Sequence, residues 1–243
     1  MDFGIFMEFE IRAANQAGAF EEGFHFVDVA EAWGLDIAWL GEMHFSPSRS
    51  VLSAPIAVAS AIASEETFPR VGQMGLPIFV GLRGMDISVL PKHLKAYREA
   101  WQAAGHPGEG DVCLRIPVYA APTEKAAREE PHDSITYYFA RQAELTKGAV
   151  GREGAGPADR QQARVDRLAT LSYDQLLNER VVFGSPAGLI DRLTRLRDEL
   201  HLGSIAAELN SGGMLSRAQA ERTLQIMTQE VMPAFNRSIR AGK

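Results

Sequence analysis

The chain has 243 residues, 46% of them hydrophobic, so it is long enough to bury a core as one large or two small domains. Its formal net charge of −6 disfavours binding to a nucleic-acid backbone, because such surfaces concentrate Lys and Arg. The single cysteine, Cys113, excludes an internal disulfide and a multi-cysteine metal site.

The beginning of the chain predicts its location. Asp2 stands where a signal peptide carries positive charge, and no apolar run reaches the length of a membrane span. We therefore expect a cytoplasmic protein whose mature chain starts at Met1.

The first elements alternate between strand and helix. Residues 3–9 form a short apolar run that predicts a strand, and residues 24–33 have helical spacing that ends at Gly34. Residues 36–41 are apolar nearly throughout, as expected for a parallel strand covered by helices. Two helix signals then abut near residues 63–64, with no strand between them.

The alternation continues in the second half. Strand-like runs cover residues 76–81 and 112–120, with a helical pattern at 89–104 between them. Residues 123–180 are charged and mostly helical in pattern, and predict an insertion over one end of the sheet.

The C-terminal part adds a helix, a strand and a closing helix. Ser185 is placed as the N-cap and Pro186 as the first residue of a helix through Glu199. A strand at 204–209 and a helix at 217–232 follow. Strands alternating with helices predict an α/β fold with a parallel sheet of about five strands.

Several motifs in this order resemble the bacterial luciferase-like flavin monooxygenases. The matching stretches are Phe3 to Phe6, Glu42 to Phe45, Gly75 to Pro77, Val182 to Ile190 and Val231 to Phe235. The resemblance implies a single domain over residues 1–243 that is an incomplete TIM-type (β/α) barrel. About three βα units of the family are absent at the junction near 63–64, whereas a full barrel has about eight.

His44 is the predicted catalytic residue. It follows the second predicted strand, at the sheet end where barrel enzymes place active-site loops, and histidine exchanges protons near neutral pH. The alternative is a histidine that only packs in a loop. In the luciferases the acid is followed by two histidines and the first is tied to catalysis, whereas here Met43 takes that place.

Ser64 and Thr67 are the predicted cofactor-binding residues. A helix N-terminus offers N–H groups and a favourable dipole to a phosphate, and the two hydroxyls match family positions that hold the flavin phosphate. Plain helix capping is the alternative. The family's basic residue after the fourth strand falls in the absent segment, which implies weak flavin affinity.

The residues expected to line a substrate pocket are Glu42, Met43, Gly81, Arg83 and Asn210. Glu42 either pairs with a cation, orients the neighbouring histidine or is a solvated acid. Gly81, Arg83 and Asn210 follow later strands, where glycine permits close approach of a ligand, although such stretches are more often turns. The scattered histidines predict no metal site.

The resemblance implies an oxidoreductase of the monooxygenase type that uses reduced FMN, supplied by a separate reductase, and O2 on a small organic substrate. A deazaflavin-dependent reductase on the same scaffold is one alternative. A non-catalytic remnant or subunit that keeps the family's dimer surface is another. A homodimer is expected, with possible contributions from Trp33, Val51 and Leu52.

Overall fold

The computed structural model describes residues 1–7, 16–40, 67–82, 85–147 and 158–235, and the statements below refer to these. Its strands are β1 Asp2–Met7, β2 Ile37–Leu40, β3 Ile78–Gly81, β4 Val112–Ala120, β5 Val182–Gly184 and β6 Ser204–Glu208. Its helices are α1 Gln16–Ala32, α2 Thr67–Gln73, α3 Leu90–Ala103, α4 Glu124–Glu129, α5 His132–Lys147, α6 Ala158–Thr170, α7 Tyr173–Glu179, α8 Pro186–Leu200 and α9 Arg217–Ile226. A 3-10 turn, Ile87–Val89, precedes α3, and a π-helical turn, Met227–Val231, extends α9.

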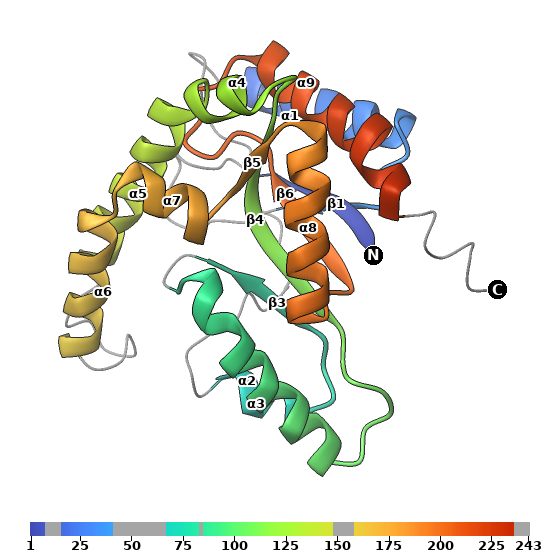
Figure 1. Ribbon diagram of the computed structural model, residues 1–243, viewed down its shortest axis with the longest axis vertical. Coiled ribbons are helices and arrows are strands. Elements are labelled where there is room, and N and C mark those ends of the chain that lie inside the picture. Colours follow the sequence, from blue (N-terminus) through green and yellow to red (C-terminus); the bar gives the residue numbers. More distant parts are fainter. Residues whose placement is uncertain (8–15, 41–66, 83–84, 148–157, 236–243) are drawn as a thin grey trace.

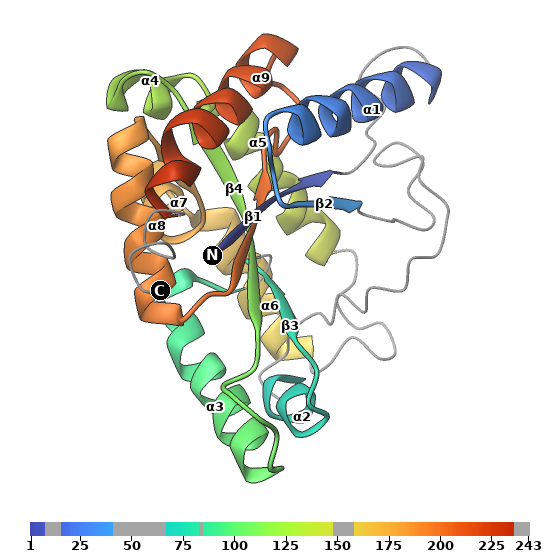
Figure 2. The same cartoon turned by 90° about the vertical axis from the view of Figure 1, so that its right-hand side faces the viewer.

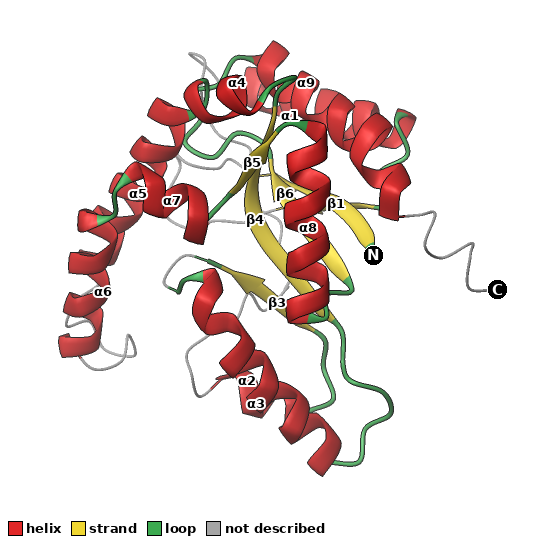
Figure 3. Ribbon diagram, viewed as in Figure 1, coloured by secondary structure: helices red, strands yellow, loops and turns green. Residues whose placement is uncertain are grey.

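The five predicted strands are all present, and β5 is an additional one (Figure 3). The sequence predicts no strand over Val182 to Gly184, which lie in a stretch that resembles the family just before the predicted helix. A strand of three residues is too short to display an alternation of its own. The predicted N-cap is confirmed, because the Ser185 hydroxyl accepts a hydrogen bond from the Gly188 N–H at 3.2 Å.

All the described strand pairings are parallel, and the sheet has the order β2-β1-β6-β4-β3. The long strand β4 is central to this arrangement. Its first half pairs with β3, and its second half pairs with β5. An α/β fold with a parallel sheet is therefore confirmed, with β4 and β6 near its centre (Figure 1).

The sheet curls as a barrel does but does not close. Trp39 of β2 and Phe79 of β3 belong to the two ends of the strand order, which a flat sheet would hold about 19 Å apart. Their ring centroids are instead 5.0 Å apart. No backbone pairing joins β2 to β3 among the described strands, so the barrel is incomplete.

The main core lies between the outer face of the sheet and the helices. Alternate strand residues such as Ile5, Ile116 and Ile205 are fully buried there, in one cluster with Leu189 and Leu193 of α8. Figure 2 shows α3, α8 and α9 on this side of the strands. The opposite face of the sheet is consequently the interior of the incomplete barrel.

The region predicted as a helical insertion consists of α4 to α7. It has a small core of its own, to which Ile135 and Phe139 of α5, Leu168 of α6 and Leu176 of α7 contribute. The N-terminal end of α5 lies against the carboxyl ends of β4 and β6, since Ser134 donates a hydrogen bond to the Ser211 carbonyl at 2.8 Å. The insertion thus covers part of the sheet edge where a barrel enzyme holds its active site.

Candidate active site

A row of interior side chains crosses four strands near their carboxyl ends. Phe6 pairs with Trp39, and Glu208 pairs with Pro117. The register that pairs Ile5 with Ala207 continues to place Phe6 level with Glu208. Because side chains alternate across a sheet and the neighbours of these residues face the outer core, the row faces the barrel interior.

Arg115 carries charge into this interior from the middle of β4. Its Nε lies 2.5 Å from Oε1 of Glu208, and the two side chains are only 10% and 11% exposed. The guanidinium also lies over the Phe6 ring, 3.7 Å from its centroid, as a cation–π contact. The Ser211 hydroxyl donates to the other Glu208 oxygen at 3.1 Å. A buried ion pair is thereby embedded among aromatic rings and hydroxyls.

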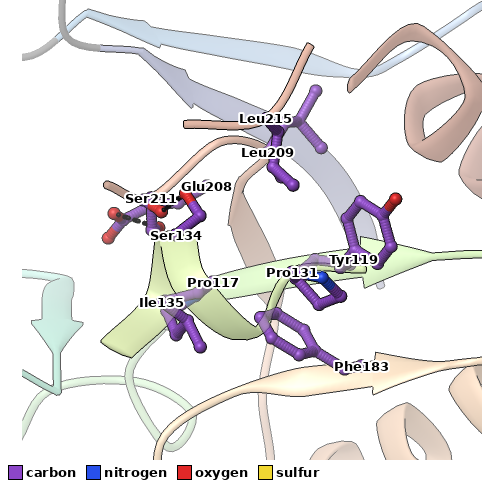
Figure 4. Close-up of a pocket in the computed structure, with 11 residues that line it drawn as sticks. Pro117, Tyr119, Pro131, Ser134, Ile135, Phe183, Glu208, Leu209, Ser211 and Leu215 are labelled. Atoms are coloured by element: carbon purple, nitrogen blue, oxygen red, sulfur yellow. Dashed lines mark hydrogen bonds between the residues drawn. The ribbon is translucent and has the colours of Figure 1, made fainter. Parts of the chain in front are cut away.

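A shallow pocket adjoins this ion pair (Figure 4). Glu208, Ser134 and Ser211 form its polar end, and Tyr119 and Phe183 are among the rings of its apolar side. Its empty volume is about 180 Å³ with open solvent included, which is below the size of ordinary ligand pockets. This pocket is therefore too small to hold a whole cofactor.

Tyr119, at the carboxyl end of β4, belongs to a polar network behind the pocket. Its hydroxyl donates to the Glu130 carboxylate and accepts from Arg222 Nη2 at 2.6 Å. Burial raises the pKa of Tyr119 to about 12. The phenol consequently stays protonated at neutral pH and braces α4 and α9 against β4.

The N-terminus of α8 is already occupied by a carboxylate. Glu124 accepts a hydrogen bond from the Ser185 N–H at 2.9 Å and another from the Ser185 hydroxyl at 2.5 Å. A Cβ atom at Gly188 would overlap with this carboxylate. The helix dipole and N–H groups that favour anions are satisfied internally, so this terminus does not fit a flavin phosphate.

The N-terminus of α9 is closed in a similar way. Ser216 and Gln219 form a capping box, in which each side chain bonds the backbone N–H of the other. Neither of these two helix ends on the carboxyl side of the sheet is available to a phosphate.

Trp39 has a buried polar atom without a partner. Its indole Nε1 is inaccessible to solvent and makes no hydrogen bond with the described part of the chain. A buried donor left unpaired costs about 1–3 kcal/mol. Such a group in a native fold calls for an explanation.

The structure places three of the predicted site residues. Gly81 ends β3 beside Arg115 on the interior face, and Thr67 is the first residue of α2. The amide of Asn210 donates to the Leu215 carbonyl at 2.9 Å and accepts from the Leu215 N–H at 3.0 Å. Asn210 therefore braces the loop after β6, and its contact with a substrate stays a prediction.

The remaining predicted site residues lie outside the described ranges. They are Glu42, Met43, His44, Ser64 and Arg83. Of the predicted dimer contacts, Val51 and Leu52 also lie outside these ranges, and Trp33 is partly buried against the main core.

The sequence did not predict that Trp39, Arg115 and Glu208 come together. One signal was present, because Arg115 interrupts a strand that is otherwise nearly all apolar, and a charged side chain is seldom buried unless it is paired. Its partner is 93 positions further along the chain and does not follow from any local pattern.

The described residues contain no cluster of His, Cys, Asp and Glu side chains that would hold a metal ion. Nor does any helix in these ranges combine the length and apolar character needed to cross a bilayer.

Three solved structures have a similar fold. The oxygenating constituent of 3,6-diketocamphane monooxygenase from Pseudomonas putida, a type II Baeyer-Villiger monooxygenase in complex with FMN, is 19% identical with a TM-score of 0.51. That match covers 91% of this chain and 64% of the enzyme, so the chain spans under two thirds of that relative.

The other two have TM-scores of 0.57. Flavoprotein 390 is 12% identical, with 100% of this chain and 98% of that protein covered. An F420-dependent secondary alcohol dehydrogenase in complex with an F420-acetone adduct is 11% identical, with 96% and 98% covered. At these identities the likeness establishes the fold alone.

Sequence comparison gives the family directly. No curated protein matches the chain. The family model for luciferase-like monooxygenases, however, matches residues 1–80 and 63–200, which together exceed half of the sequence. The incomplete parallel barrel agrees with that match, and the chain belongs to the luciferase-like monooxygenase family.

Proposed function

We propose that this chain binds a flavin-type cofactor at the carboxyl ends of its strands and oxidises a small organic substrate as a monooxygenase. The observation that carries the proposal is the interior row of Trp39, Phe6 and Glu208, together with Arg115. It combines flat aromatic faces, a cation, a carboxylate and an orphaned N–H at the position where barrel enzymes bind their ligands.

These residues suit the ring of a flavin. An isoalloxazine ring is planar and apolar on its faces and carries hydrogen-bond acceptors on its edge, so the aromatic wall and the N–H of Trp39 match both properties. When bound, reduced FMN supplies the electrons with which molecular oxygen is reduced and the substrate oxygenated. The chain's own contribution is to orient the ring and exclude water.

The phosphate of the cofactor is assigned to Ser64 and Thr67. The N-terminus of α8 is filled by Glu124 and that of α9 by its capping box. The family resemblance places the phosphate at the segment that leads into α2, and Thr67 opens that helix. His44 keeps its proposed role as the proton-exchanging residue, with Glu42 and Met43 beside it in the substrate pocket.

A deazaflavin-dependent reductase is the second candidate. The name of one structural neighbour, an F420-dependent secondary alcohol dehydrogenase, favours it, since the same fold there accepts a deazaflavin. The third candidate is a non-catalytic subunit, which the absence of pairing between the described strands β2 and β3 favours.

A titration with FMN, reduced FMN and coenzyme F420, followed by cofactor fluorescence, tests the proposal. We expect binding that weakens at least tenfold when Ser64 and Thr67 are both changed to Ala, because each loses a charge-assisted hydrogen bond worth about 1.5–3 kcal/mol. A matched control changes Ser88 and Thr170 to Ala, two exposed hydroxyl residues on other elements.

The outcomes separate the candidates. Binding of FMN with oxygen-dependent turnover supports the monooxygenase, and binding of F420 alone supports the reductase. Binding of neither cofactor to the unmodified protein refutes both and leaves the non-catalytic subunit.

A further inference from the structure

The indole N–H of Trp39 is a buried donor with no partner in the part of the chain that the structure describes. Hydrogen bonds satisfy nearly all buried polar groups in native proteins. Trp101 illustrates the rule in this chain, because its indole Nε1 donates to the Pro107 carbonyl at 3.0 Å. The contrast between these two tryptophans makes the Trp39 N–H an exception that needs a partner from outside the described residues.

The surroundings of Trp39 narrow the kind of partner. Phe79 lies 5.0 Å from it between ring centroids, and Phe6 lies beside it in register and 6.2 Å from Phe79. These three aromatic side chains are only partly buried. They offer apolar faces to a flat ligand. Aromatic rings pack against such a ligand in offset or tilted stacks.

The polar groups nearby add a second requirement on the ligand. Arg115 lies over the Phe6 ring at 3.7 Å and reaches Glu208, so one cation and one carboxylate lie beside the three aromatic rings. A ligand that satisfies the Trp39 N–H needs an acceptor at its edge. A planar ring system with carbonyl or ring-nitrogen acceptors meets both requirements.

We propose that Trp39 donates its indole N–H to the ring system of a bound flavin or deazaflavin and so sets the orientation of that ring. The inference rests on the proposed function and assigns a donor within that site. Because Nε1 is covered, this contact requires a neighbouring side chain to move aside, and Phe79 is a partly buried ring in contact with Trp39.

The chain is suited to a direct test, because it contains only three tryptophans, Trp33, Trp39 and Trp101. Labelling tryptophan with ¹⁵N gives one indole N–H signal for each, and single Trp→Phe variants assign them. On saturation with FMN or with coenzyme F420, we expect the Trp39 indole proton to move downfield as its hydrogen bond forms. The Trp101 signal, already hydrogen bonded, is the internal control and should stay in place.

Affinity provides a second measurement. Trp39→Phe retains an aromatic ring and deletes the N–H, and we expect cofactor binding to weaken about two- to tenfold, the equivalent of one ordinary hydrogen bond. Trp101→Phe also deletes an indole hydrogen bond but acts on α3, so its affinity should equal that of the unmodified protein. The shift of the Trp39 signal is read on the unmodified protein, so it is measured separately from the affinities of the two variants.

The titration in which the Trp39 signal moves, with FMN or with F420, shows which of the two ring systems accepts the hydrogen bond. Cofactor binding with an unmoved Trp39 signal and an unchanged affinity in Trp39→Phe overturns this inference and leaves the proposed function standing. Binding of neither cofactor to the unmodified protein overturns both.

Discussion

Asp86 and Arg180 form an ion pair in which the side chains are 0% and 1% exposed. Asp86 lies just before the 3-10 turn that precedes α3, and Arg180 ends α7. The same guanidinium donates to the carbonyls of Leu82 and Met85 at 2.7 and 2.8 Å. The pair therefore ties the connection after β3 to the helical insertion, close to the carboxyl edge of the sheet.

Loss of Arg180 should be strongly destabilising. Arg180→Leu leaves the Asp86 carboxylate in the interior with Arg167, a mostly exposed cation, as its remaining ionic partner. Breaking a buried ion pair from one side costs about 3–5 kcal/mol, and we expect a loss of that order in the free energy of unfolding from urea titrations.

The matched control is Arg195→Leu, which removes an exposed helix pair with Asp191. A surface pair of this kind is worth at most about 1 kcal/mol. Equal effects of the two substitutions would contradict the role assigned to the buried pair.

The local elements of this fold were predictable because each depends on neighbours in sequence. Ser185 and Pro186 indicate the start of α8 through capping and a fixed φ, and a run that is apolar except for Arg115 indicates β4. Three-residue β5 was not separable from the turn beside it, since no alternation develops over so short a span.

The candidate site was predictable only in part, because its partners are distant along the chain. Arg115 was noticeable as a cation in an apolar strand, but Glu208, Phe6 and Trp39 meet it only once the sheet has curled. An orphaned N–H such as that of Trp39 is a property of packing and leaves no trace in residue order.

The link between α1 and α9 should weaken in acid. The hydrogen bond from Arg217 first, and that from His25 next, hold the pKa of Glu221 below its usual value. A carboxyl group whose pKa is lowered by folding contributes stability that is complete above its unfolded pKa and is lost as the pH falls through the folded value. We therefore expect the free energy of unfolding to decline below about pH 4.5, and to decline less steeply in Glu221→Gln.

For comparison, Glu144→Gln removes an exposed carboxyl group within α5 and leaves the contact between α1 and α9 intact. Parallel curves for Glu221→Gln and the unmodified protein would show that the contact between α1 and α9 makes no contribution in this range.

Replacing His201 should stabilise the protein. His201 follows α8 in the left-handed region, with φ of 51° and ψ of 54°, where a side chain with a Cβ is strained and glycine is not. His201→Gly is expected to raise the free energy of unfolding by about 1 kcal/mol, measured by urea titration. His201→Ala keeps the Cβ and should give no gain, so a gain in both variants would assign the effect to the imidazole instead.

Gly212 should tolerate no side chain, for a reason beyond its backbone angle. It has φ of 94° in the loop after β6, and a Cβ there would overlap with the Ser134 carbonyl at the start of α5. Gly34 also has a positive φ, 78°, but nothing lies within 4 Å of a Cβ built on it. Gly34→Ala should therefore cost about 1 kcal/mol of backbone strain, and Gly212→Ala should cost the same strain plus about 1–3 kcal/mol for the displaced backbone. Equal losses in the free energy of unfolding of the two variants would mean that α5 moves away freely. The close approach of Gly212 to the Ser134 carbonyl would then not fix the position of Ser134 and Ser211 in the pocket.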